Sequence, residues 1–167
     1  MKNKVLALTS CLMLFYGFAN AQRLEKDEVD KFTKEQVRET GYENIWRNAM
    51  MGGLIEAKVK SSNGDMTLWL NLHLTSSFIV MSDNKIYLLL QNDSSIALKS
   101  IAGTVGKPTK HVWHGQVGYL ITPEDAKFLR ASPLKAIRID FAGNYDTYNI
   151  KERNSSTITD MLKLVQQ

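Results

Sequence analysis

Residues 54–74 read LIEAKVKSSNGDMTLWLNLHL, and this stretch decides the fold. Two runs of alternating apolar residues flank Asn63-Gly64, a dipeptide that tolerates the positive φ angles of a tight hairpin turn. Side chains of a strand point alternately to its two faces, so the second run has one wholly apolar face. That face holds Met66, Leu68, Leu70, Leu72 and Leu74. The pattern predicts an antiparallel hairpin with one side in the core.

The other face of the second run is a candidate ligand-binding surface. It carries Thr67, Trp69, Asn71 and His73. A tryptophan beside amide and imidazole groups is typical of surfaces that bind proteins or sugars. The competing interpretation is structural, because an apolar helix near the C-terminus needs a sheet face and Trp69 could lie beneath it. The sequence leaves both interpretations open.

Most of the remaining chain reads as further short strands. Residues 29–46 predict a strand pair with a break near Lys34-Glu35, whereas residues 48–53 suit either a helical turn or a bulged connection. Short apolar runs then predict a β-meander, at residues 78–81, 86–90 and 96–101. The other expected elements are a loop at residues 102–110 and strands at residues 111–121, 134–141 and 145–151.

Two short helices are expected, at residues 123–131 and 156–165. The first opens with Thr122-Pro123-Glu124-Asp125, which combines a capping residue, a proline tolerated at the first helical position and acids that favour the positive helix end. In the second, Thr157 and Asp160 have the spacing of a capping box. Its apolar stripe comprises Ile158, Met161, Leu162 and Val165. The whole pattern predicts an α+β, β-rich fold with an antiparallel meander or sandwich-like sheet and two short helices.

Residues 1–21 read as a cleavable secretory signal peptide. The basic segment Met1-Lys2-Asn3-Lys4 precedes an uncharged apolar run at residues 5–18. Ala19-Asn20-Ala21 then supplies the small residues of a cleavage site, with Gln22 as the new N-terminus. The apolar run is shorter than the ~20 residues that span a bilayer. We therefore expect export to the periplasm or the extracellular space, with no transmembrane span.

Lipid anchoring at Cys11 is the alternative interpretation of the N-terminus. Leu8-Thr9-Ser10-Cys11 resembles a lipobox, whose cysteine receives the lipid. Only residues 5–8 would precede that cysteine as an apolar core, fewer than the ~7 residues of an ordinary signal. Cleavage at Ala21 is therefore the expectation that we favour.

Cleavage after Ala21 would change the composition of the folded part. It would leave 146 residues, a usual size for one domain, which we divide into a charged leader at residues 22–28 and a single β-rich domain at residues 29–167. It would also remove Lys2 and Lys4, which lowers the net charge from +4 to +2. The remaining charges of both signs are interspersed, and this argues against nucleic-acid binding.

The sequence holds no constellation typical of catalysis or of metal binding. Cys11 is the only cysteine, so the cleaved chain would have no disulfide, no thiol nucleophile and no thiolate metal site. His111 and His114 are three residues apart, which places them on opposite faces of a strand, and His73 is the only other histidine. Asp140 and Asp146 flank a turn and are expected to be solvated. We therefore predict no catalytic residue, no metal site and no cofactor.

Three parts of the chain carry a resemblance to known sequences. They are Ala19-Asn20-Ala21-Gln22, Asp30-Lys31-Phe32-Thr33, and the stretch from Tyr119-Leu120-Ile121-Thr122-Pro123-Glu124-Asp125 to Lys135-Ala136-Ile137-Arg138-Ile139. In these parts the chain resembles a group of uncharacterised secreted proteins of Bacteroides-type bacteria. The resemblance implies an exported protein of a Gram-negative bacterium. It implies no activity and transfers no site residues.

Three functions are compatible with these features. We favour an exported non-catalytic domain that binds a protein partner or a glycan in the periplasm or at the cell surface, because an export signal is present and no convergent catalytic set is. One alternative is a small exported hydrolase with a site assembled from distant residues, which needs a histidine near a serine or a carboxylate in a cleft. The other is a structural or assembly subunit that docks through an unpaired strand edge. The oligomeric state does not follow from the sequence.

Overall fold

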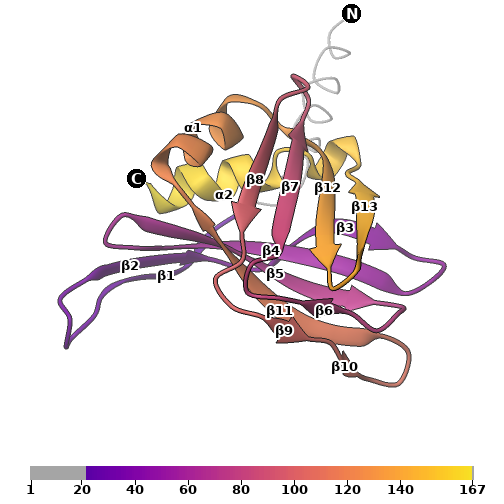
Figure 1. Ribbon diagram of the computed structural model, residues 1–167. Helices are drawn as coiled ribbons and strands as arrows, with labels where there is room; N and C mark the ends of the chain where they lie inside the picture. Colours follow the sequence, from indigo (N-terminus) through magenta and orange to yellow (C-terminus); the bar gives the residue numbers. More distant parts are fainter. Residues whose placement is uncertain (1–21, 167) are drawn as a thin grey trace, which may run out of the picture.

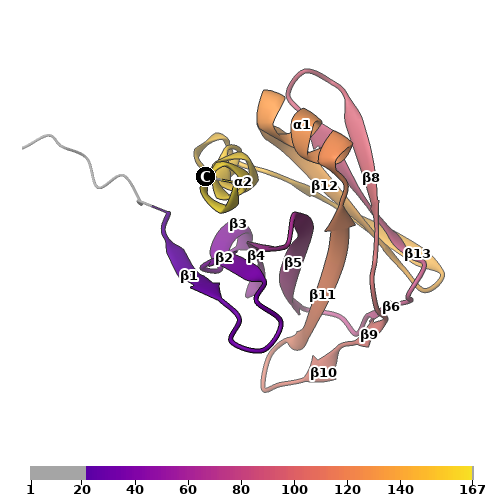
Figure 2. The same ribbon diagram turned by 90° about the vertical axis from the view of Figure 1, so that its left-hand side faces the viewer.

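The computed structural model describes residues 22–166, so the expected signal peptide and the lipobox cysteine lie outside the described residues. The described part has an α+β, β-rich fold with antiparallel sheets and two helices. A four-stranded sheet stands over one face of a seven-stranded sheet, and its strands cross those of the larger sheet (Figure 1). Both helices lie on that same face of the larger sheet, as the turned view also shows (Figure 2).

The elements divide among three sheets and the helical segments. The seven-stranded sheet contains β1 (Leu24–Val29), β2 (Gln36–Thr40), β3 (Glu43–Asn48), β4 (Gly53–Ser62), β5 (Asp65–Leu74), β11 (Trp113–Ile121) and β10 (Lys107–Pro108). The four-stranded sheet has the order β13 (Asn144–Asn149), β12 (Leu134–Phe141), β7 (Lys85–Leu90) and β8 (Ser95–Lys99). A two-stranded ribbon joins β6 (Ile79–Val80) to β9 (Thr104–Val105). The helical segments are α1 (Pro123–Ala131), the 3-10 turn η1 (Glu152–Asn154) and α2 (Thr157–Val165).

The predicted hairpin of residues 54–74 is confirmed and lies at the centre of the larger sheet. β4 and β5 pair without interruption from Leu54 opposite His73 to Ser62 opposite Asp65. The turn residues Asn63 and Gly64 have φ angles of 52° and 90°, which is why an Asn-Gly pair suits this position. The alternating apolar residues of β5 are all buried, as predicted.

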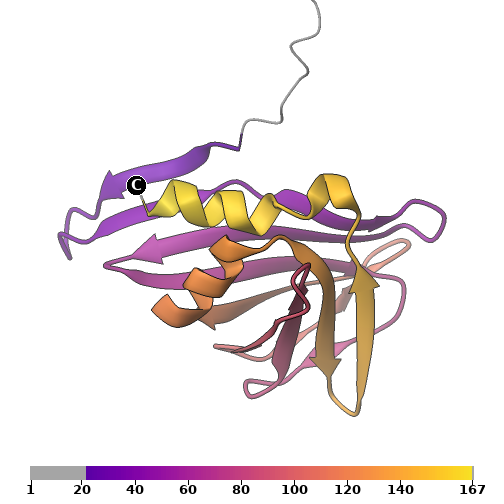
Figure 3. The same ribbon diagram turned by 90° about the horizontal axis from the view of Figure 1, so that it is seen from above.

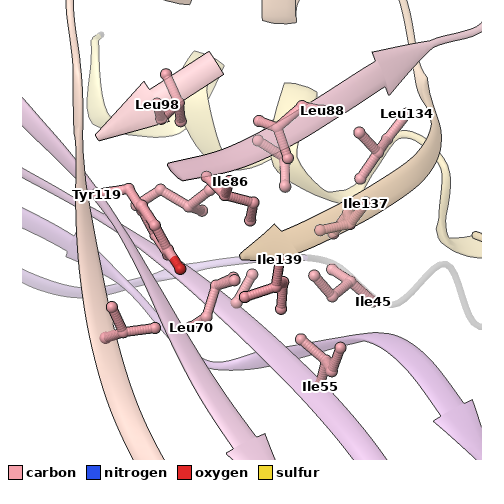
Figure 4. Close-up of a cluster of buried hydrophobic side chains, with 14 of the residues drawn as sticks. Ile45, Ile55, Leu70, Ile86, Leu88, Leu98, Tyr119, Leu134, Ile137 and Ile139 are labelled. Atoms are coloured by element: carbon pink, nitrogen blue, oxygen red, sulfur yellow. The ribbon is translucent and has the colours of Figure 1, made fainter. Parts of the chain in front are cut away.

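The core fills the space between the two larger sheets. Figure 4 shows Ile55 and Leu70 of the larger sheet near Ile137 and Ile139 of the smaller one, and all four side chains are fully buried. α2 lies along the larger sheet beside α1 (Figure 3), where it packs on β4 and β2. The apolar stripe of α2 is buried there. The helix therefore packs on the core-facing side of the larger sheet, and not on the opposite side, which carries Trp69.

The expected charged leader at residues 22–28 is largely a strand. Leu24–Val29 forms β1, which pairs with β2 at the edge of the larger sheet. An edge strand faces water, so its charged side chains remain solvated, and Asp27 also pairs with Arg38. The leader prediction was wrong because a solvated edge strand lacks the apolar alternation by which strands are identified.

The predicted meander is interrupted. β7 and β8 form the expected hairpin, but β6 pairs with β9, which lies within the segment 102–110 that was expected to be a loop. The other neighbour of β7 is β12, far along the chain. Apolar runs indicate that a strand is present, but they do not identify its partner.

Both helices occur where the sequence predicts them. α1 has the full capping box between Thr122 and Asp125. The capping box predicted for Thr157 and Asp160 is wrong: Ser156 is the N-cap of α2 and makes no capping hydrogen bond with its side chain. Ser156 has helical backbone angles because η1 leads almost directly into α2, whereas a cap normally needs extended backbone. Within residues 22–166, neither helix has the length and apolarity needed to cross a membrane.

Candidate functional site

The four residues of the predicted binding surface share the outer face of β5, opposite its buried row. Thr67, Trp69, Asn71 and His73 are all half-buried. Because α2 packs on the core side of the sheet, Trp69 does not lie beneath it. The Trp69 ring lies instead over Gly118 of β11, where an added Cβ would come within 3.2 Å of it.

Two of these residues belong to a polar network on that outer face. His114 of β11 lies directly opposite His73, with ring centroids 4.8 Å apart. Asn71 Nδ2 donates to Glu56 Oε2 at 2.8 Å, and Asn71 Oδ1 lies 2.7 Å from His114 Nε2. His73 Nε2 is 3.6 Å from Glu56 Oε2. β11 begins at Trp113, so His111 lies before the strand and not on its opposite face as predicted. The contact of His114 with His73 was not predicted, because the register between β5 and β11 has no local signal.

The Glu56, Asn71 and His114 side chains of this network hydrogen-bond one another. In the described part of the chain, no group of three or more His, Cys, Asp or Glu side chains has an arrangement that could hold a metal ion. Neither His73 nor His114 hydrogen-bonds a serine or threonine hydroxyl among residues 22–166, the contact that would activate such a nucleophile. The bonds of Asn71 to Glu56 and to His114 link β4, β5 and β11 across the outer face of the sheet.

A cleft of about 560 Å³ opens at one end of the space between the two larger sheets. Its walls come from β3 and the end of β5 on one side, and from the β12–β13 hairpin on the other. The start of β11 and the β6–β9 ribbon complete the lining. The cleft has no signature in the sequence, because its residues come from segments far apart in the chain.

A β-bulge aims Trp46 into the cleft. The pairing of β3 with β4 shifts between Asn44 and Trp46, so Ile45 and Trp46 both reach the interior. Ile45 is fully buried in the core, whereas Trp46 is half-buried and lines the cleft. The Trp46 ring meets Tyr148 of β13 edge-on, with ring centroids 4.8 Å apart. This contact connects the two sheets.

Phe78 is held between two glycines beside the cleft. A Cβ on Gly106 would lie 2.8 Å from the Phe78 ring, and one on Gly115 would lie 2.9 Å from it. The Gly106 N–H also donates to the Phe78 carbonyl at 2.9 Å. Only glycine permits so close an approach, so both glycines fix where the ring lies.

The polar wall of the cleft comes from β13. Asn144, Asp146 and Tyr148 pair with buried residues of β12, so they share the core-facing side of the hairpin. The Tyr148 hydroxyl donates to Asp146 Oδ2 at 3.4 Å. Burial, together with the Asp146 carboxylate, raises the pKa of Tyr148, so its hydroxyl remains protonated as a donor. Asp146, expected from the sequence to be a solvated turn residue, is exposed but faces the cleft.

The cleft is negatively charged and has an apolar rim. Apart from the Tyr148 phenol, Asp146 is the only ionisable side chain among the described residues that line it. Asp146 forms no ion pair with another described residue. Three exposed apolar side chains also line the cleft: Met51, Ile79 and Val105.

Comparison of the chain with models of protein families, with curated proteins and with solved structures found no match. Its function is therefore inferred from the geometry described above.

Proposed function

We propose that this chain is an exported, non-catalytic domain that binds a protein partner or a glycan in the periplasm or at the cell surface, and that the ligand occupies the cleft. The observation that carries the proposal is the convergence of Trp46, Trp113 and Tyr148, from three different strands, on one concave space. Aromatic walls with a few directed polar groups are typical of ligand sites. The proposal that the chain is exported rests on residues 1–21, which read as a secretory signal peptide.

The cleft offers both kinds of contact that such a ligand needs. The aromatic rings provide apolar area, and the Asn144, Asp146 and Ser77 side chains provide polar groups. Asn48 adds a donor, because its Oδ1 already accepts from the backbone N–H groups of Met50 and Met51 at 3.2 Å each. That bonding leaves the Asn48 Nδ2 group available to a ligand.

A binding role also agrees with the chemistry of the lining. General acid–base catalysis needs a positioned donor and acceptor with matched pKa values, and glycoside hydrolysis ordinarily needs two carboxyl groups. Among the described residues that line the cleft, Asp146 is the only carboxylate, and there is no histidine, lysine or arginine. The lining therefore supports recognition rather than bond cleavage.

The proposal is tested by binding to defined glycan and peptide arrays. Ser77→Trp would fill the cleft from an exposed position, and Ser95→Trp places the same side chain at an exposed position of β8, away from the cleft lining. We expect at least one array ligand to bind the unaltered protein and the Ser95→Trp variant alike, and to bind Ser77→Trp at least tenfold more weakly. If no ligand of either class shows this dependence on Ser77, the proposal is wrong.

A further inference from the structure

We infer that the ligand is an extended peptide segment of a partner protein, and that Asp146 binds the cationic group of a lysine or arginine in that segment. This inference rests on the proposed function and specifies its ligand. Three independent features of the cleft support it: its charge, its aromatic walls and the free strand edge beside it.

The charge of the cleft favours a cation. Asp146 has no basic partner among residues 22–166, and no other described carboxylate or basic side chain lines the cleft. An anionic ligand would therefore meet a negative charge without compensation. A lysine or arginine would instead form a charge-assisted hydrogen bond with the carboxylate, the stronger class of such bonds. Cleavage after Ala21 would leave the chain with a net charge of +2, so the local charge of the cleft is opposite to the overall one.

The aromatic walls suit the rest of a basic side chain. Tyr148 lies two residues after Asp146 on the same face of β13, and its hydroxyl contacts the carboxylate. Trp46 meets Tyr148 edge-on, so both rings lie near a cation bound at Asp146. Cations are attracted to aromatic faces, and the aliphatic stems of lysine and arginine pack on apolar surface.

The edge of β13 favours a peptide over a glycan. β13 is the terminal strand of its sheet, and no described strand pairs with its outer edge. The Ile150 N–H donates to the Lys135 carbonyl, and hydrogen-bonded pairs alternate along the β12–β13 ladder. The backbone groups of Tyr145 and Thr147 therefore point to the open edge. An extended peptide can add to such an edge through its own amides, which a glycan cannot do.

The apolar rim agrees with a peptide ligand as well. Met51 and Val105 are 63% and 61% exposed, and they line the cleft together with Ile79. Methionine is common at surfaces that bind peptides, because its flexible side chain adapts to different partners. Residues that flank the basic one would cover this rim.

The test uses labelled pentapeptides with the sequence Thr-Val-X-Val-Thr, blocked at both ends, where X is Lys, Arg, Gln or Glu. Binding to the purified protein is measured by fluorescence anisotropy. We expect the Lys and Arg peptides to bind about tenfold or more tightly than the Gln peptide, the effect of one hydrogen bond to a charged group. The Glu peptide should bind most weakly.

Asp146 variants assign this preference to its carboxylate. Asp146→Asn should abolish the difference between the Lys and Gln peptides, and Asp146→Glu should retain part of it. Asp65→Asn removes the same charge from an exposed position at the start of β5, outside the cleft lining, and should change nothing. Circular dichroism of each variant confirms that it is folded.

The possible failures are distinguishable. Peptide binding that is lost in Ser77→Trp but is equal for Lys and Gln would overturn this inference and leave the proposed function in place. Binding of a glycan that depends on Ser77, with no binding of any peptide, would likewise overturn this inference and leave the proposed function in place. If neither ligand class binds in a manner that depends on Ser77, both proposals are wrong.

Discussion

Removal of one buried hydroxyl should stabilise this protein. Tyr119 is 0% exposed, and its hydroxyl has no hydrogen-bond partner among residues 22–166. Figure 4 shows it among buried aliphatic side chains that include Leu70 and Ile139. A buried polar group without a partner costs about 1–3 kcal/mol. Phenylalanine keeps the ring, so Tyr119→Phe should raise the free energy of unfolding by about 1–3 kcal/mol.

The assay for Tyr119→Phe is equilibrium unfolding in urea. The m-value of a small protein is about 1–3 kcal/mol/M, so a gain of about 2 kcal/mol should raise the midpoint by about 1 M while the slope stays constant. Tyr87→Phe is the matched control, because Tyr87 lies on β7 and is 37% exposed. Its free energy of unfolding should change by less than about 0.5 kcal/mol. An unchanged or lower midpoint for Tyr119→Phe would show that the hydroxyl has a partner, such as a buried water.

Tyr119→Phe should also change how the stability of the protein depends on pH in the alkaline range. Burial raises the pKa of Tyr119, and the Asp140 carboxylate adds to the rise. The folded chain therefore keeps this phenol protonated at pH values where the same phenol in the unfolded chain, with a pKa of about 10, releases its proton. This contribution to stability is present below pH ~10 and is lost as the pH rises further, at about 1.4 kcal/mol per pH unit. The stability of Tyr119→Phe should fall less steeply above pH ~10 than that of the unaltered protein.

Three further substitutions follow from contacts described above. Gly115→Ala places a Cβ 2.9 Å from the Phe78 ring, and such overpacking should lower the free energy of unfolding by about 1–3 kcal/mol in a urea titration. Thr122→Ala removes the side-chain cap of α1, which should cost about 1 kcal/mol in the same assay, and a loss below about 0.3 kcal/mol would contradict the capping role. Burial raises the pKa of Tyr42 to about 12, so a tyrosine that ionises near that pH should disappear from the ultraviolet absorbance titration of Tyr42→Phe.

The parts of the fold that the sequence predicted have local signals. Asn63-Gly64 specifies a tight turn between two runs of alternating residues, and Thr122 with Asp125 specifies the start of α1. These signals act within a few residues, so they do not depend on the rest of the chain. The shared face of Thr67 and His73 was predictable for the same reason, because alternation along one strand needs no partner.

The cleft could not be predicted, because its residues depend on pairings between distant segments. Strict alternation places Ile45 and Trp46 on opposite faces of β3, and only the bulge brings both to the interior. Asp146 and Tyr148 are far from Trp46 in the chain, and they meet it only because the two sheets pack together. The neighbours of β7 and β11 likewise follow from the packing of the whole core.

Because Trp46 and Tyr148 are in contact across the two sheets, a ligand bound to both rings should raise the melting temperature of the protein. The two rings belong to different sheets, so a molecule that contacts both opposes the separation of those sheets. A ligand that binds only the folded chain, present at 100 times its Kd, stabilises that chain by about 2.7 kcal/mol. A rise in melting temperature would therefore reveal an occupant of the cleft in a screen of unlabelled compounds, with no need to know in advance what the protein does.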